Sequence, residues 1–301
     1  MSNIEFIESK LKENYPNDYQ NILFGLYSKK RVTFRVNTLK STIVSVMQEL
    51  NSIGLMVEKV GFSEVALILK EGSELDLQNL SIYKEGHIYL QSLSSMLPPI
   101  VLNALKGDVL DMAAAPGGKT TQMAALAQNQ IQIMACEQNP IRAQKLEFNL
   151  KRQGANKVNV VVKDARQLDD FYRFDHILLD APCSGSGTLD LNRLDSYKTF
   201  TPQLIEKSIQ TQKALILKAI QLLKPNQTMV YSTCSLLKSE NEAIVKYALA
   251  TKQVEIIPIE LKDIETLPSN LEGVVTVMPS ALYEGFFIAL LRKIPHAKTK
   301  L

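Results

Sequence analysis

The chain has 301 residues, of which 46% are hydrophobic and 22% charged, so it can bury a core in one large domain or two modest ones. No apolar run reaches the roughly 18 residues of a membrane span, and the N-terminus lacks a secretion signal, so we expect a cytosolic protein. The net charge of +3 comes without a basic tail, which leaves only local basic patches for a polyanionic partner.

The first 95 residues predict a small α/β domain. Two helices come first, followed by a strand at Arg31–Val36, a helix at Ile43–Ile53 and a short apolar strand at Val65–Leu69. A serine-rich run that ends in Pro98-Pro99 predicts a boundary, so we expect domains at 1–95 and 96–301.

The remainder alternates apolar strands with helices, which predicts a mostly parallel sheet covered on both faces. The predicted strands are 109–113, 131–137, 158–164, 174–182, 228–234, 254–260 and 285–293. The predicted helices are 123–127, 141–152, 204–223 and 240–250. Because no helix separates the last two strands, we expect them to form an antiparallel hairpin at an edge of this sheet.

Polar residues gather where the first five of these strands end. Ligands of open α/β sheets bind outside the carboxyl ends of the strands, so these residues mark a candidate site. In chain order they are Asp111, the run AAAPGGKT, Glu137, Asp164, Asp180, Cys183 and Cys234.

The run AAAPGGKT indicates an adenosine ligand without phosphates. A phosphate loop needs a glycine where this chain has Ala113, and the dinucleotide pattern G-x-G-x-x-G is absent. Glu137 is placed to accept hydrogen bonds from ribose hydroxyls and Asp164 from an adenine amino group, which S-adenosylmethionine satisfies. The alternative for both acids is a helix cap or a surface ion pair.

Two of the three cysteines, Cys183 and Cys234, lie in polar turns at this edge. A thiolate that adds to carbon 6 of a cytosine makes carbon 5 nucleophilic enough to take a methyl group, and Asp180 could hydrogen-bond the ring. The spacing does not rank the two thiols. The alternative is that they are buried hydrophobes, which is our interpretation of Cys136.

No metal site is expected, because His87, His176 and His296 are far apart in the sequence. A basic cluster around Lys29-Lys30-Arg31, with Arg35 and Lys40, is a candidate contact for a polyanion. A solvated surface is the alternative.

Several motifs resemble the NOL/NOP/Sun (NSUN) family of RNA cytosine-5 methyltransferases, over nearly the whole chain. They are RVNTLK at 35–40, GHIYLQSLSSML at 86–97, AAAPGGKT, DAPCSGSGT, YSTCS followed by ENE, and MP…GFF. The resemblance implies a Rossmann-like S-adenosylmethionine-dependent methyltransferase domain that follows a small RNA-binding domain. It implies that Cys234 is the nucleophile and that Cys183 helps to release the product. The cofactor contacts that it implies are Ala113, Ala114, Ala115, Pro116, Gly117, Gly118, Lys119, Glu137, Arg142, Asp164 and Asp180.

Two positions depart from the family pattern. Glu284 replaces an aspartate before Gly-Phe-Phe, and the stretch LDLNRLDSYKTF leaves Arg193 as its main basic residue. Since no further domain follows in this sequence, we expect RNA contacts from residues 1–95 and the rim of the site.

We therefore expect a monomeric enzyme that methylates ribosomal or transfer RNA and does not bind a membrane. The alternatives are a non-catalytic RNA-binding assembly factor, which would need neither thiol, and a DNA cytosine-5 methyltransferase, which would carry a target-recognition insertion.

Overall fold

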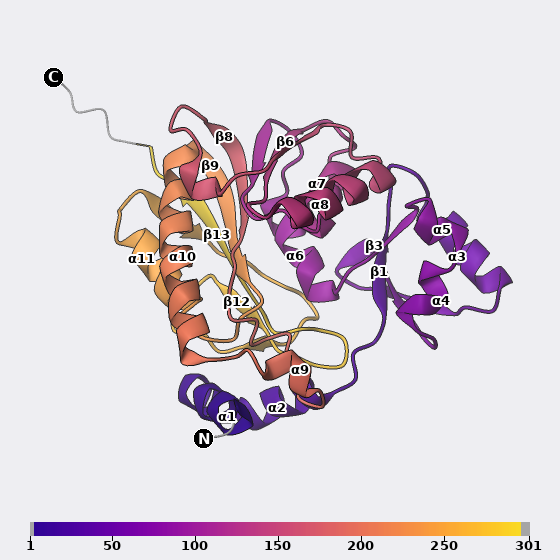
Figure 1. The fold of residues 1–301 in the computed structure, drawn as a ribbon, viewed down its shortest axis with the longest axis horizontal. Coiled ribbons are helices and arrows are strands. Elements are labelled where there is room, and N and C mark those ends of the chain that lie inside the picture. The colour runs from indigo at the N-terminus through magenta and orange to yellow at the C-terminus, as the bar shows by residue number, and fades with distance from the viewer. Residues whose placement is uncertain (1–2, 296–301) are drawn as a thin grey trace.

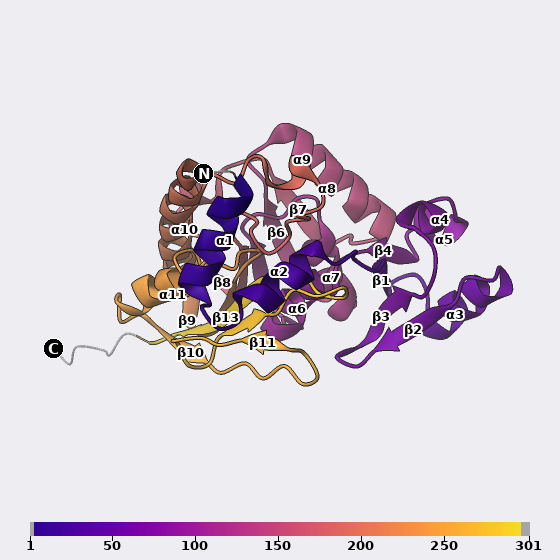
Figure 2. The same ribbon diagram turned by 90° about the horizontal axis from the view of Figure 1, so that it is seen from below.

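The computed structural model describes residues 3–295, and its first two helices pack on the large domain (Figures 1 and 2). The helices are α1 (Asn3–Asn14) and α2 (Tyr19–Tyr27). Ile7 and Leu11 of α1 lie in one apolar cluster with Phe200 and Leu236. These two predicted helices therefore share a core with residues far along the chain, rather than with the small sheet that follows them.

The small α/β unit is a four-stranded antiparallel sheet in the order β2-β3-β1-β4 with helices against it. Its core includes Phe34, Leu50 and Leu67. The predicted strands and helix of this unit are confirmed, while the shorter elements were not predicted. The unit contains β1 (Thr33–Val36), α3 (Ile43–Ser52), β2 (Val57–Val60), β3 (Ser63–Leu69), α4 (Glu74–Gln78), α5 (Ser81–Lys84) and β4 (Ile88–Leu90).

Pro98 and Pro99, which suggested a break in structure, lie inside helix α6 (Leu93–Leu102). A proline removes one helical N–H and leaves a carbonyl free one turn earlier. The carbonyl of Ser95 is the one that Pro99 leaves free, and the side-chain amide of Gln91 donates to it at 3.1 Å. The proline pair therefore does not interrupt the helix. The division at residues 95/96 itself remains a prediction.

The large domain is built on a nine-stranded sheet with five parallel strands in the order β7-β6-β5-β8-β9. The predicted parallel sheet is confirmed. The parallel strands are β5 (Asp108–Asp111), β6 (Gln132–Cys136), β7 (Val158–Val161), β8 (Phe174–Asp180) and β9 (Leu223–Thr233). The chain runs outward from β5 in both directions, so the switch point of the sheet lies between β5 and β8.

Helices cover both faces of this sheet (Figure 1). Helices α6, α7 and α8 pack on one face through an apolar cluster that includes Leu97, Met123 and Leu146. Helices α10 and α11 pack on the other through a cluster that includes Ile216 and Ile244. The helices not yet bounded are α7 (Gly118–Leu126), α8 (Pro140–Gln153), η1 (Ala165–Gln167), α9 (Leu194–Tyr197), α10 (Pro202–Leu222) and α11 (Glu242–Leu249).

The antiparallel edge is confirmed and is more elaborate than the predicted hairpin. Strand β13 (Phe286–Lys293) runs antiparallel to β9. Its outer side pairs with β10 (Val254–Ile257) along one half and with β12 (Val275–Val277) along the other. A two-residue strand, β11 (Thr266–Leu267), extends the edge beyond β12. Strands β11 and β12 were missed because they are too short to show an apolar period.

Within residues 3–295, no helix is both long and apolar enough to cross a membrane.

Candidate active site

Two adjoining cavities open at the carboxyl ends of the parallel strands. The larger, of about 610 Å³, is lined by the AAAPGGKT loop, Asp180, Cys234 and residues of the small domain such as Tyr89. The smaller, of about 40 Å³, is lined by Glu137, Arg142 and Asp164. Ala113 lines both. The predicted site residues at the five strand ends are therefore brought together at the switch point.

The AAAPGGKT loop enters helix α7 through a backbone turn that needs glycine. Gly117 precedes the helix with φ of 108°, and a Cβ there would meet the Leu146 side chain at 2.9 Å. Arg35, from the small domain, is buried and donates to the Gly118 carbonyl at 3.1 Å and to Thr121 Oγ1 at 2.7 Å. The first turn of α7 is thus held from the small domain.

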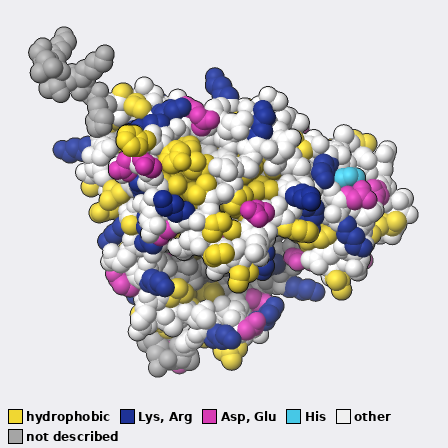
Figure 3. All heavy atoms as spheres, turned by 45° about the horizontal axis from the view of Figure 1, so that its top comes forward, with side chains coloured by type: hydrophobic (Ala, Val, Ile, Leu, Met, Phe, Trp, Pro, Cys, Tyr) yellow, Lys and Arg dark blue, Asp and Glu magenta, His cyan; other side chains and the backbone are white. Residues whose placement is uncertain are grey.

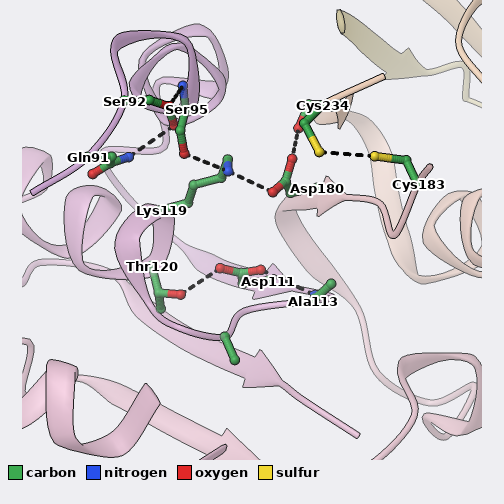
Figure 4. Close-up of polar contacts among 12 residues, drawn as sticks. Gln91, Ser92, Ser95, Asp111, Ala113, Lys119, Thr120, Asp180, Cys183 and Cys234 are labelled. Carbon is green, nitrogen blue, oxygen red and sulfur yellow. Dashed lines mark hydrogen bonds and ion pairs between the residues drawn. The ribbon is translucent and has the colours of Figure 1, made fainter. Parts of the chain in front are cut away.

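Asp111, at the end of β5, is buried beneath this loop (Figure 4). Its carboxylate accepts hydrogen bonds from Thr120 Oγ1 at 2.7 Å and from the Ala113 amide at 3.4 Å. Burial raises the pKa of Asp111 to about 6, against the opposing effect of the Thr120 hydrogen bond. Asp111 supports the loop from below and also contributes to the wall of the larger cavity.

Asp180, at the end of β8, is paired with Lys119 across the larger cavity (Figure 4). The Lys119 ammonium lies 2.7 Å from Asp180 Oδ2 and donates to Ser95 Oγ at 2.9 Å. Burial opposes the charge on Lys119, but the attraction of Asp180 outweighs it and raises the pKa of Lys119. Ser232 donates to the other Asp180 oxygen at 2.8 Å, so the carboxyl group is held on both sides where it faces the cavity.

The two thiols lie side by side, with the Sγ atoms of Cys183 and Cys234 3.2 Å apart (Figure 4). Cys234 lines the larger cavity, and Cys183 is not among the residues that line it. The hydrogen bond to Cys234, followed by burial, raises the pKa of Cys183 well above its usual range. Cys183 therefore keeps its proton at neutral pH. Cys136 is fully buried in the core, as expected.

The two acids of the smaller cavity have partners within the chain. Glu137 accepts a hydrogen bond from the Asn139 amide at 2.8 Å and lies 3.5 Å from Arg142, which also donates to the Ala115 carbonyl at 2.8 Å. Asp164 caps the short helix η1 and forms an ion pair with Arg166 at 2.5 Å. The Arg166 pair, followed by partial burial that opposes it, holds the pKa of Asp164 below its usual range.

The basic cluster of residues 29–40 is not one continuous surface, because Arg35 is buried, and contact of its other members with a polyanion stays a prediction. The Lys30 ammonium donates to the carbonyls of Gly25, Ser280 and Tyr283 at 2.6–3.2 Å. Arg35 is buried, and Lys40 donates to two carbonyls at 2.7 and 2.8 Å. On the face that Figure 3 displays, Lys and Arg side chains are dispersed among acidic and apolar ones. Of the cluster, Lys29 and Lys40 are exposed, and Lys30 and Arg31 line the larger cavity.

The two residues that depart from the family pattern differ in their surroundings. Glu284 accepts from Ser92 Oγ at 2.6 Å, at the start of α6, and lines the larger cavity. Arg193 is exposed and pairs with Asp195 at 2.8 Å. Of the histidines considered above, His296 lies outside the described residues.

Sequence reasoning missed the residues that fix the cysteine turns. Gly187 donates from its amide to the Cys234 carbonyl at 2.9 Å, and a Cβ on Gly187 would meet the Gly285 carbonyl oxygen at 2.0 Å. Glu240, the first acid of the ENE run, is fully buried between the two turns. The motifs SGSG and ENE were the signal, but only the fold shows what they contact.

Known proteins match this chain over most of its length. A family model described as 16S rRNA methyltransferase RsmB/F matches residues 99–292, and one described as the ferredoxin-like domain of RsmF/B-like methyltransferases matches residues 5–76. A ribosomal RNA small subunit methyltransferase F of Vibrio atlanticus is 36% identical over 90% of this chain and 60% of its own length. The one from Shewanella loihica is 37% identical over 97% of this chain and 63% of its own. The chain thus spans less than two thirds of the length of these relatives.

Solved structures agree in fold with nearly the whole chain. A methyltransferase homologue from Pyrococcus horikoshii superposes with a TM-score of 0.83 at 31% identity, covering 95% of this chain and 94% of that one. The NSun6 protein of Pyrococcus horikoshii, solved with SFG, superposes with a TM-score of 0.85 at 25% identity, covering 96% of this chain and 98% of that one.

Proposed function

Because the chain belongs to the RsmB/F family of 16S rRNA methyltransferases, we propose that it methylates carbon 5 of a cytosine in RNA through a covalent cysteine adduct. Small-subunit ribosomal RNA is the proposed substrate class, since the relatives named above carry that activity in their names. We further propose that residues 1–95 and 96–301 are the RNA-binding and methyltransferase domains.

The observation that carries the proposal is the arrangement of Cys234. Its side chain lines the larger cavity, its Sγ atom lies 3.2 Å from that of Cys183, and the Lys119–Asp180 pair lines the same cavity. A scaffold that only binds RNA has no use for two adjacent thiols beside a fixed carboxylate.

The proposed roles follow from which group faces the substrate. Cys234 would add as the thiolate to carbon 6 of the cytosine, and Asp180 would accept a hydrogen bond from the ring amine or from a protonated ring nitrogen 3. Water then takes the carbon 5 proton, the electron pair of that bond forms the carbon 5–carbon 6 double bond, and the carbon 6–sulfur bond breaks with its electron pair returning to Cys234. Cys183, which keeps its proton at neutral pH, would protonate the departing thiolate and so release the product.

The residues of the two cavities suit S-adenosylmethionine, which supplies an electrophilic methyl group on a sulfonium. Glu137 and Asp164 are hydrogen-bond acceptors in the smaller cavity, as ribose hydroxyls and an adenine amino group require. Ala113 lines both cavities, so one ligand can extend from the acids to Cys234. We propose the cofactor contacts to be Ala113–Lys119, Glu137, Arg142, Asp164 and Asp180. The structural relative solved with SFG, a cofactor analogue, supports this assignment.

The test is methyl transfer from labelled S-adenosylmethionine to deproteinised small-subunit RNA and to transfer RNA, with bisulfite sequencing of the labelled product. We expect label in the ribosomal RNA at a cytosine and none with Cys234→Ala. Binding of RNA and cofactor without any transfer would instead favour the assembly factor, and transfer to duplex DNA would favour the DNA enzyme.

A further inference from the structure

A buried carboxylate lies directly behind the two thiols. Glu240 follows the turn after β9 and is completely inaccessible to solvent. Among residues 3–295 it makes no ion pair with a lysine or arginine, so its oxygens are satisfied by hydrogen bonds alone. A buried charge is costly unless its lone pairs are filled, so an acid retained here needs a local reason.

The hydrogen bonds to Glu240 come from both cysteine turns. On the Cys183 side, Ser184 donates its amide to Oε1 at 2.8 Å and its hydroxyl to Oε2 at 2.5 Å. On the Cys234 side, Ser235 donates its hydroxyl to the same Oε2 at 2.5 Å. One carboxylate oxygen therefore joins the residues that directly follow the two cysteines.

A third element braces this arrangement. Gln212 of α10 donates its side-chain amide to Glu240 Oε1 at 3.3 Å and to the Pro182 carbonyl at 2.9 Å. The Glu240 carbonyl accepts the Tyr231 hydroxyl at 2.6 Å, which ties its backbone to β9. Neither turn can move relative to the other without breaking at least one short hydrogen bond to a charged acceptor.

We propose that Glu240 is a positioning residue that sets the distance between the Cys183 and Cys234 thiols by clamping Ser184 and Ser235 to one carboxylate. The proposal deepens the proposed function and rests on it for its catalytic consequence. Adduct release requires Cys183 to reach the sulfur of Cys234, so a looser pair slows release more than it slows addition. The negative charge of Glu240 also adds to the hydrogen bond with Cys234 and to burial in keeping the pKa of Cys183 high.

The chain supplies a matched control two residues further on. Glu242 is also buried, but its carboxylate accepts from Ser269 at 3.0 Å, away from both turns. Glu240→Gln and Glu242→Gln each replace a buried carboxylate by an amide of the same shape. Only Glu240→Gln puts an amide nitrogen where two serine hydroxyls point their hydrogens.

The first measurement is the rate at which diamide closes a disulfide between Cys183 and Cys234 in the free protein, followed by alkylation and mass spectrometry. Two thiols lose two hydrogen atoms to diamide, which is reduced to the hydrazine. The sulfurs are 3.2 Å apart and need approach by only about 1 Å, so closure reports their alignment. Loss of the Glu240 charge favours the reactive Cys183 thiolate, but we expect the lost alignment to outweigh this, so that Glu240→Gln closes about tenfold more slowly than the parent chain, as for the loss of one or two hydrogen bonds, and Glu242→Gln matches the parent. Equal rates for all three proteins would overturn the proposal.

The second measurement is the lifetime of the covalent protein–RNA complex on a denaturing gel, with methylation by labelled cofactor. We expect Glu240→Gln to retain the complex longer at an unchanged KM for the cofactor, which a general loss of structure would not produce. If the parent chain methylates nothing, the proposed function fails while the disulfide rates still decide on Glu240. Should Glu240→Gln not fold, Ser184→Ala and Ser235→Ala each remove one donor, and normal disulfide closure in both would reject the clamp.

Discussion

Replacing Asp111 by asparagine should change the pH dependence of stability in a way that can be worked from the structure. Asp111 is buried under the AAAPGGKT loop, and burial raises its pKa from 3.8 to about 6. An acid whose pKa is higher in the folded state binds its proton more tightly there. Ionisation of Asp111 therefore opposes folding, and this cost appears as the pH rises from 3.8 through 6.

The size of the effect follows from the two pKa values. A shift of one pKa unit corresponds to about 1.4 kcal/mol, so ionised Asp111 lowers the free energy of unfolding by about 3 kcal/mol at pH 8. At pH 4 the group is protonated in the folded chain and the cost is only about 0.5 kcal/mol. The asparagine side chain of the variant does not titrate and still offers an oxygen to Thr120. From pH 4 to pH 8 the free energy of unfolding of the variant should therefore rise by about 2.5 kcal/mol relative to that of the parent.

The assay is urea unfolding of both proteins without cofactor at intervals across this range, because the difference between them cancels the other titrating groups. Asp175→Asn is the control, and the change of its stability difference with pH should have the opposite sign. Burial opposes the charge on Asp175, but the Asp108 amide at 2.9 Å and Lys224 at 2.9 Å outweigh it and lower its pKa. The stability that Asp175 contributes is therefore lost as the pH falls. If the free energies of unfolding of Asp111→Asn and the parent differ by the same amount at every pH, the reasoning is refuted.

Three further outcomes are expected. Cys183→Ala should accumulate a covalent protein–RNA complex on a denaturing gel while Cys234→Ala and the double variant show none, because addition and release need different thiols; the reverse pattern would exchange their roles. Asp164→Ala should raise the KM for the cofactor more than it lowers kcat, because the proposed hydrogen bond between Asp164 and the cofactor is made in the ground state as well as in the transition state. A loss confined to kcat would contradict this. Lys30→Ala should lower the free energy of unfolding by about 1–3 kcal/mol because three carbonyls lose their donor, whereas Lys29→Ala should leave it unchanged in the same urea assay.

The parallel sheet and the position of its active edge could be predicted because both are encoded locally. A strand buried on two faces is apolar at nearly every position, so β6 and β8 are recognisable from their own residues. The motifs come immediately after these strands in the sequence, and all parallel strands end at the same edge of the sheet. Glu137 and Asp180 could be placed at that edge without knowing any contact between them.

What the sequence could not determine are the contacts between segments far apart in the chain. Lys30 and Arg35 look like surface cations in a basic run, yet one binds the Ser280 carbonyl 250 residues away and the other contacts Thr121. Whether a charged side chain meets water or a carbonyl depends on packing that no local pattern contains.

The two thiols also show what the sequence could determine and what it could not. Their turns could be assigned to neighbouring strand ends, but only the tertiary structure turns Cys234 toward the cavity and sets Cys183 behind it. In our proposal the distance between the two sulfurs depends on Glu240, whose carboxylate is reached from Ser184, 56 residues earlier in the chain, and from Ser235, five residues earlier. Residue type and spacing limit which groups can react, while the distance between two sulfur atoms is decided by the hydrogen bonds that close behind them.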